Sequence, residues 1–161
     1  VSIGSSCNVC IEDDERRASI LKCGLKGNCS VYASGIRNAV GFVFHPKTYE
    51  MYATENSRDL LGDDLPPDEI NLVKESNHYG WPFCYGKNIH DPEYNKGCES
   101  RTPSFIDLQA HSAPLGLAFN FGSNFPENRM TTCLSGLRYS ERDSATSRYA
   151  VACVATKITD T

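Results

Sequence analysis

The sequence has no hydrophobic run approaching the ~20 residues that a membrane-spanning helix needs. Sixteen basic and twenty acidic residues give a net charge of -4, and no Lys/Arg-rich run exists that could neutralise a line of phosphates. We therefore expect neither a transmembrane segment nor a nucleic-acid partner. The sequence also lacks a Gly-x-Ser-x-Gly motif and a phosphate-binding glycine loop, so it gives no ground for predicting a serine hydrolase or a nucleotide-binding enzyme.

A signal peptide is also missing from the start of the sequence. Residues 1–4, Val-Ser-Ile-Gly, have the pattern of a strand and carry no charged segment followed by a long apolar one. A mature protein rarely begins inside a strand. We therefore interpret the sequence as lacking its N-terminal part.

Cysteine, in contrast, is abundant for 161 residues. The count favours disulfides in an exported protein, periplasmic or extracellular. Free buried thiols and a zinc site organised by the first four cysteines are the alternatives. Five residues separate the second pair, outside the usual spacing of a zinc knuckle. The eight are Cys7, Cys10, Cys23, Cys29, Cys84, Cys98, Cys133 and Cys153.

Short strands account for most of the remaining pattern. Six segments of alternating or apolar character are each bounded by Gly, Pro, Asn or Asp, and residues 41–55 fit a hairpin with a turn that contains a proline. Helical periodicity is not sustained anywhere. Many short strands with frequent turns predict an all-β sandwich, barrel or propeller. The six are Arg17–Lys22, Ser30–Ala33, Gly41–His45, Glu50–Glu55, Glu69–Lys74 and Gly116–Asn120.

Four ordered stretches carry more information than the strand pattern. Residues 35–44 read Gly-Ile-Arg-Asn-Ala-Val-Gly-Phe-Val-Phe, and residues 53–73 run from Ala-Thr-Glu-Asn to Pro-Asp-Glu-Ile-Asn-Leu-Val. Tyr-Gly-Trp-Pro follows at 79–82, and His-Ser-Ala-Pro-Leu-Gly-Leu-Ala-Phe at 111–119. In this order and spacing the chain resembles the soluble pyrroloquinoline-quinone-dependent glucose/sorbosone (aldose sugar) dehydrogenase family.

The resemblance implies a partial six-bladed β-propeller made of four-stranded antiparallel blades. It also implies oxidation of an aldose or sorbosone-like sugar by hydride transfer to pyrroloquinoline quinone beside bound calcium. The natural electron acceptor cannot be read from the sequence. The family's general-base histidine and several of its cationic quinone contacts have no counterpart in these residues, so we expect the chain alone to be inactive.

Site residues follow from the same resemblance. Arg37 and Asn38 stand where the family contacts the quinone, and a fixed guanidinium would stabilise negative charge on the reduced cofactor. Glu69 and Tyr79 correspond to a calcium site in the family. A second calcium would take backbone carbonyls at Ser57 and Arg58.

Each of these residues has a simpler interpretation. Arg37 could pair with a surface carboxylate, and the acidic run around Glu69 could be a solvated loop. Trp81 is expected to pack in the core. A non-catalytic propeller module that binds carbohydrate or protein is the alternative function, because propellers host many activities.

The resemblance covers residues 1–128, which we predict to be incomplete propeller blades. Residues 129–161 are expected to be a divergent tail, and one hypothesis is that the tail is read out of frame. Glycines that the family favours are replaced at Tyr49, Ser57 and 76–77. A β-carbon costs roughly 1 kcal/mol or more wherever such a position needs positive φ.

Overall fold

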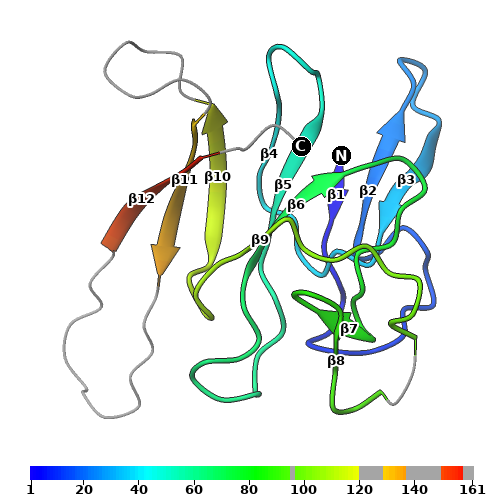
Figure 1. Ribbon diagram of the computed structural model, residues 1–161. Helices are drawn as coiled ribbons and strands as arrows, with labels where there is room; N and C mark the ends of the chain where they lie inside the picture. Colours follow the sequence, from blue (N-terminus) through cyan, green and yellow to red (C-terminus); the bar gives the residue numbers. More distant parts are fainter. Residues whose placement is uncertain (95–96, 120–128, 137–149, 158–161) are drawn as a thin grey trace.

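All regular structure in the described part of the chain is β-strand (Figure 1). The computed structural model describes residues 1–94, 97–119, 129–136 and 150–157. Each of the six predicted strands overlaps a strand of the structure, with ends that agree to within about two residues, the usual uncertainty of strand boundaries. The prediction of an all-β fold is confirmed.

The strands form three main antiparallel sheets that lie side by side (Figure 1). The first contains β1 (Ser2–Ile3), β2 (Ser19–Cys23) and β3 (Cys29–Ser34). The middle sheet contains β4 (Phe42–Phe44), β5 (Met51–Glu55), β6 (Glu69–Val73) and β9 (Ile106–Asp107). The third contains β10 (Pro114–Phe119), β11 (Arg129–Gly136) and β12 (Ala150–Lys157), and β7 (Cys84–Tyr85) pairs separately with β8 (Ile89–His90). Sheets of consecutive antiparallel strands in a row are the arrangement of neighbouring propeller blades.

The predicted hairpin at residues 41–55 forms β4 and β5. Its turn places Tyr49 at φ 60°, and Ser76, in the loop after β6, has φ 67°. Both residues stand where the sequence resemblance expects glycine. The expected steric penalty of a β-carbon at positive φ therefore applies at these two positions.

Buried apolar side chains lie on both faces of the middle sheet. One cluster fills the space toward the first sheet and includes Ile20, Ile36 and Met51, and the other surrounds Tyr52 and Ile70. Ile70, in the second cluster, is fully buried. Trp81 is 6% exposed, which confirms its predicted place in the packed interior.

Two adjacent sheets meet backbone to backbone at Gly41. A β-carbon at Gly41 would lie 2.3 Å from the carbonyl oxygen of Leu115 in β10. The Gly41 carbonyl also accepts the amide hydrogen of Thr54 at 2.8 Å. Only glycine allows this approach between the middle and third sheets.

Six of the cysteines form disulfides. Cys7 pairs with Cys10, and Cys23 pairs with Cys29. The zinc arrangement built from these four cysteines is therefore wrong, because their sulfurs are bonded to one another. A third disulfide joins Cys84 to Cys98. Together the three bridges indicate an extracytoplasmic protein.

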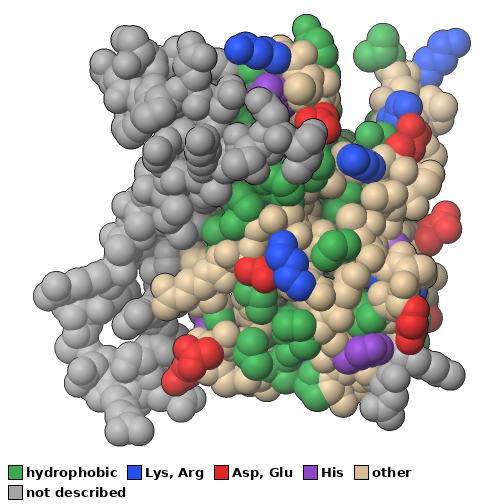
Figure 2. All heavy atoms as spheres, viewed as in Figure 1, with side chains coloured by type: hydrophobic (Ala, Val, Ile, Leu, Met, Phe, Trp, Pro, Cys, Tyr) green, Lys and Arg blue, Asp and Glu red, His purple; other side chains and the backbone are tan. Residues whose placement is uncertain are grey.

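Basic, acidic and hydrophobic side chains are interspersed over the described part of the face in Figure 2. None of the described residues belongs to a helix long and apolar enough to cross a bilayer.

Candidate functional site

Two carboxylates face each other at the end of the middle sheet. Glu55 ends β5, Glu69 begins β6, and the two residues are register partners. Both are almost fully buried, with 3% and 2% exposure. The Nδ2 atom of Asn71 donates to an oxygen of each, at 2.9 Å for Glu55 and 3.0 Å for Glu69. We call Glu55 and Glu69 the carboxylate pair.

The remaining oxygens of the carboxylate pair accept backbone amides. The Arg37 amide donates to Glu55 Oε1 at 2.8 Å, and the Gly86 amide donates to Glu69 Oε1 at 2.5 Å. Burial raises the pKa of Glu69 to about 7. Burial, and then the charge of Glu69, raises the pKa of Glu55 well above its usual range. Neither carboxylate has a cationic side chain as its hydrogen-bond partner among the described residues.

One buried oxygen beside the carboxylate pair has no partner. Asn71 Oδ1 is the only buried side-chain N or O atom without a hydrogen bond among the residues the structure describes. A buried acceptor left unsatisfied costs about 1–3 kcal/mol, and two buried carboxylates in contact repel each other when ionised. A hard cation would relieve both penalties, because calcium binds carboxylate and amide oxygens. The donor set therefore fits calcium.

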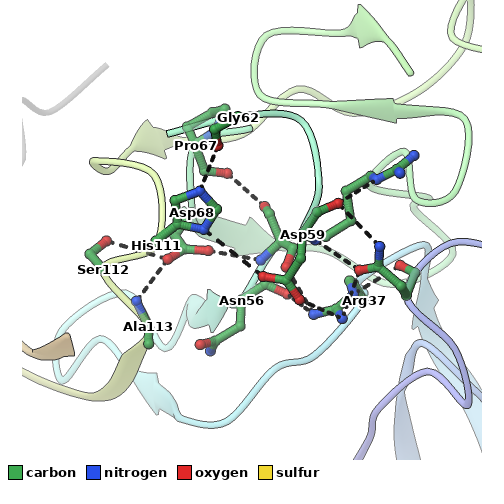
Figure 3. Close-up of polar contacts among 12 residues, drawn as sticks. Arg37, Asn56, Asp59, Gly62, Pro67, Asp68, His111, Ser112 and Ala113 are labelled. Carbon is green, nitrogen blue, oxygen red and sulfur yellow. Dashed lines mark hydrogen bonds and ion pairs between the residues drawn. The ribbon is translucent and has the colours of Figure 1, made fainter. Parts of the chain in front are cut away.

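Arg37 is held firmly a short distance from the carboxylate pair. Its Nε donates to Asn8 O at 3.1 Å, and its Nη2 donates to Asn8 Oδ1 at 3.2 Å. Its Nη1 donates to the carbonyl oxygens of Asn56 and Ser57, at 3.3 and 2.8 Å. Asp59 lies on the same side, with a carboxylate oxygen 3.8 Å from Nη2 (Figure 3). The guanidinium is only 17% exposed, so its position is well defined.

Arg37 and its partner Asn8 both line an open hollow of about 400 Å³. Asn38 lies next to Arg37 in its wall, and the Asn38 carbonyl accepts the amide hydrogen of Asn56 at 3.0 Å. The predicted contact of Arg37 and Asn38 with a cofactor stays a prediction. The hollow is also lined by Ser5, Ser6, Cys7 and Asn8.

Ser57 is fixed by its neighbours as well as by Arg37. Its amide donates to Asp68 Oδ1 at 2.8 Å, and Asp68 Oδ2 accepts the amide of Ala113 at 2.8 Å (Figure 3). The Ser57 hydroxyl donates to Pro67 O at 2.6 Å. The Ser57 carbonyl already accepts one hydrogen bond from Arg37, and a carbonyl oxygen has a second lone pair. Its predicted role as a backbone calcium ligand stays a prediction.

Arg58, the other predicted backbone ligand, uses its side chain in an ion pair. Its Nη1 lies 2.9 and 3.0 Å from the two oxygens of Asp91, and its Nη2 lies 2.7 Å from Glu93. The side chains of Arg58 and Asp91 are 5% and 2% exposed. We call these three residues the Arg58 cluster. It ties the loop after β5 to the loop after β8.

Tyr79 does not bring its hydroxyl to the carboxylate pair. The hydroxyl donates to Leu72 O at 2.6 Å and accepts the Lys74 amide at 2.8 Å. Those partners belong to the far end of β6, about 10 Å along the strand from Glu69. A metal-binding role for Tyr79 stays a prediction, and its side chain is engaged elsewhere.

His111 lies on the opposite side of Asp59 from Arg37 (Figure 3). Its Nε2 is 2.9 Å from the carbonyl oxygen of Gly62, and its Nδ1 is 3.9 Å from Asp59 Oδ1. These contacts join the loop before β10 to the loop after β5.

Three site residues were missed by sequence reasoning. Glu55 and Asn71 lie within the second ordered stretch, residues 53–73, and Asn71 follows Glu69 by two residues, on the same face of the strand. That period-two spacing is a signal that could have grouped Asn71 with Glu69. Asn8 has no comparable signal, because it meets Arg37 only through the fold.

The structure resembles solved propeller enzymes. An AA12 carbohydrate-active enzyme of Trichoderma reesei, in a calcium structure, matches with TM-score 0.74 and 18% identity over 98% of this chain and 49% of that one. The holo pyranose dehydrogenase PQQ domain of Coprinopsis cinerea matches with TM-score 0.66 and 18% identity over 97% and 55%. These matches define the fold class: the chain has the fold of β-propeller blades.

Sequence comparison names the family. Residues 23–149 match glucose/sorbosone dehydrogenase, and the chain therefore belongs to the glucose/sorbosone dehydrogenase family. An uncharacterized protein of Borreliella burgdorferi is 45% identical over 132 residues, which are 79% of this chain and 35% of that protein. An uncharacterized protein of Synechocystis is 29% identical over 66% of this chain and 26% of that protein. The chain thus spans about a third or less of the length of these relatives.

Proposed function

We propose that the chain is part of an exported quinoprotein sugar dehydrogenase, periplasmic or extracellular, that oxidises an aldose or sorbosone-like sugar. The observation that carries the proposal is Arg37, a fixed guanidinium beside Asn38 at the wall of an open polar hollow. Family membership and the fit of the carboxylate pair to calcium support it.

The residues divide into two groups by chemistry. Arg37 would hold positive charge beside the cofactor, and Asn38 would orient it through a neutral amide. Glu69, with Glu55 and Asn71, would hold calcium. When bound, pyrroloquinoline quinone supplies an acceptor for the hydride of the sugar C–H bond, and calcium supplies a fixed positive charge.

The electrostatic contribution of Arg37 follows from its surroundings. Negative charge that develops on the cofactor during hydride transfer would meet a guanidinium already held by protein oxygens. Such a preorganised charge needs little rearrangement at the moment of reaction, which is what makes it effective. The proton of the sugar hydroxyl would leave to a base outside the residues described.

The test is reconstitution of the complete gene product with pyrroloquinoline quinone and calcium, followed by a redox dye and a panel of aldoses. We expect dye reduction that requires sugar, quinone and calcium together. Absence of quinone binding and of sugar-dependent dye reduction would overturn the proposal. Carbohydrate binding without dye reduction would instead favour a non-catalytic propeller module.

A further inference from the structure

The loop of residues 5–10 follows β1 and returns on itself at the Cys7–Cys10 disulfide. The bridge closes a ring of four residues, and this short ring presents Asn8 toward Arg37. A covalent closure of this kind limits the conformations open to the chain between its ends. The loop therefore offers Asn8 from a constrained backbone.

Asn8 makes contacts with three separate parts of the fold. Its Oδ1 accepts from Arg37 Nη2 and from the Asp59 amide, at 3.2 and 2.8 Å. Its Nδ2 donates to Asp59 O at 3.1 Å. Its carbonyl oxygen accepts from Arg37 Nε at 3.1 Å and from Trp81 Nε1 at 3.3 Å. No other described residue supplies two acceptors to the Arg37 side chain from a separate loop.

Most N–H groups of the Arg37 guanidinium already have protein acceptors. A guanidinium has five N–H groups. Within the described part of the chain, four of them donate to Asn8, Asn56 and Ser57. One Nη2 hydrogen is left, and its nearest carboxylate is that of Asp59 at 3.8 Å, on a side chain that is 65% exposed. A bound acidic ligand can therefore compete for this hydrogen.

We propose that the disulfide-closed loop of residues 5–10 is a clamp that sets the direction of Arg37, with Asn8 as its positioning residue. The clamp leaves one N–H of Arg37 for an oxygen of the quinone cofactor and contributes lining residues to the hollow. The inference rests on the proposed function. It adds the N-terminal loop and its disulfide to the cofactor site.

Three variants of the complete gene product test the clamp. They are Asn8→Ala, the double variant Cys7→Ala/Cys10→Ala, and the control Cys23→Ala/Cys29→Ala. The control removes another disulfide of short span, at the tip of the β2–β3 hairpin. This tip lies at the opposite end of the first sheet from the loop that follows β1 (Figure 1). Pyrroloquinoline quinone binding is measured by absorbance titration in excess calcium, and calcium binding by calorimetry.

We expect quinone affinity to fall about tenfold in Asn8→Ala, because hydrogen bonds to a charged group are among the stronger ones. The Cys7→Ala/Cys10→Ala variant loses affinity in the same direction, and the Cys23→Ala/Cys29→Ala control does not. Calcium affinity stays within about twofold in all three, because the carboxylate pair makes no contact with Asn8. Equal quinone affinity in wild type and Asn8→Ala would overturn the clamp.

A double-mutant cycle separates positioning from general destabilisation. If Asn8 acts through Arg37, then Asn8→Ala added to Arg37→Ala changes quinone affinity little further. Full additivity would show that Asn8 acts independently of Arg37, and the clamp would be wrong. Wild-type protein that binds no quinone would overturn the proposed function together with the clamp. Wild-type binding with no effect of Asn8→Ala would overturn the clamp alone.

Discussion

The carboxylate pair and the Arg58–Asp91 contact of the Arg58 cluster are both buried, but they differ in the sign of their charges. In the Arg58 cluster a guanidinium meets two carboxylates at 2.7–3.0 Å. In the carboxylate pair two acids meet each other, beside an amide oxygen without a partner. The first cluster is electrostatically complete and ties loops together. The second is complete only when protonated or when a cation joins it.

The largest loss of unfolding free energy should appear when the Arg58 cluster is broken. Arg58→Met leaves Asp91 buried without its cation, and we expect a loss of about 3–5 kcal/mol in unfolding free energy. Urea unfolding of the complete gene product measures it. The control is Arg16→Met, which removes an exposed ion pair with Asp14 and should leave the unfolding midpoint unchanged. Equal midpoints for both variants would contradict a structural role for the cluster.

The carboxylate pair should make the calcium-free protein less stable as pH rises. Its acids have a raised pKa in the folded state, to about 7 for Glu69. Between the unfolded value near 4.5 and about 7, the folded state therefore holds protons that the unfolded state has released. Stability is full below about pH 4.5 and falls as pH rises through 7, by about 3 kcal/mol for Glu69 alone.

The measurement is thermal unfolding in chelator from pH 4.5 to 8, for wild type and Glu55→Gln/Glu69→Gln. His78, whose pKa burial lowers to about 4, acts in the opposite direction but equally in both proteins. The difference between the two curves therefore isolates the pair. A difference that does not change with pH would contradict the coupled, buried pair.

Calcium binding should distinguish Glu69 from Arg37. Glu69→Gln replaces a charged ligand by a neutral amide, and we expect calcium affinity to fall about 10- to 100-fold. Arg37→Ala should leave calcium affinity unchanged and weaken quinone binding instead. Calcium calorimetry and quinone absorbance titrations on both variants provide the four affinities. If all four affinities equal those of the wild type, the proposed calcium and quinone sites are wrong, although the fold assignment would still hold.

The smallest effect should come from the exposed member of the Arg58 cluster. Glu93 is 57% exposed, so solvent screens its contact with Arg58. Glu93→Gln should cost less than about 1 kcal/mol in urea unfolding, well below Arg58→Met. A loss as large as that of Arg58→Met would contradict this. It would mean that the exposed contact with Glu93 contributes as much to stability as the buried contact with Asp91.

The strands could be predicted from sequence because their signals are local. Alternating residues bounded by turn formers mark β5 and β6 without reference to the rest of the chain. The family resemblance then supplied the propeller and drew attention to Arg37 and Glu69. The roles of Arg37 and Glu69 in binding stay predictions.

Contacts set by register and long-range packing could not be predicted in the same way. Glu55 meets Glu69 only because β5 and β6 pair in one register across the intervening loop. Asn8 contacts Arg37 although 29 positions separate them in the sequence. For Cys7, Cys10, Cys23 and Cys29, the sequence could not distinguish two disulfides from a zinc site, and the fold shows disulfides. For Tyr79 the sequence motif gave the position of the residue but not the hydrogen-bond partners of its hydroxyl, which are Leu72 and Lys74.

The backbone contact at Gly41 makes a single position decisive for the distance between the middle and third sheets. Neighbouring sheets meet there through main-chain atoms, with Leu115 O placed where a β-carbon would stand. The spacing of the two sheets at this point therefore depends on main-chain atoms and not on side-chain size. Any side chain at Gly41 itself would force the two sheets apart.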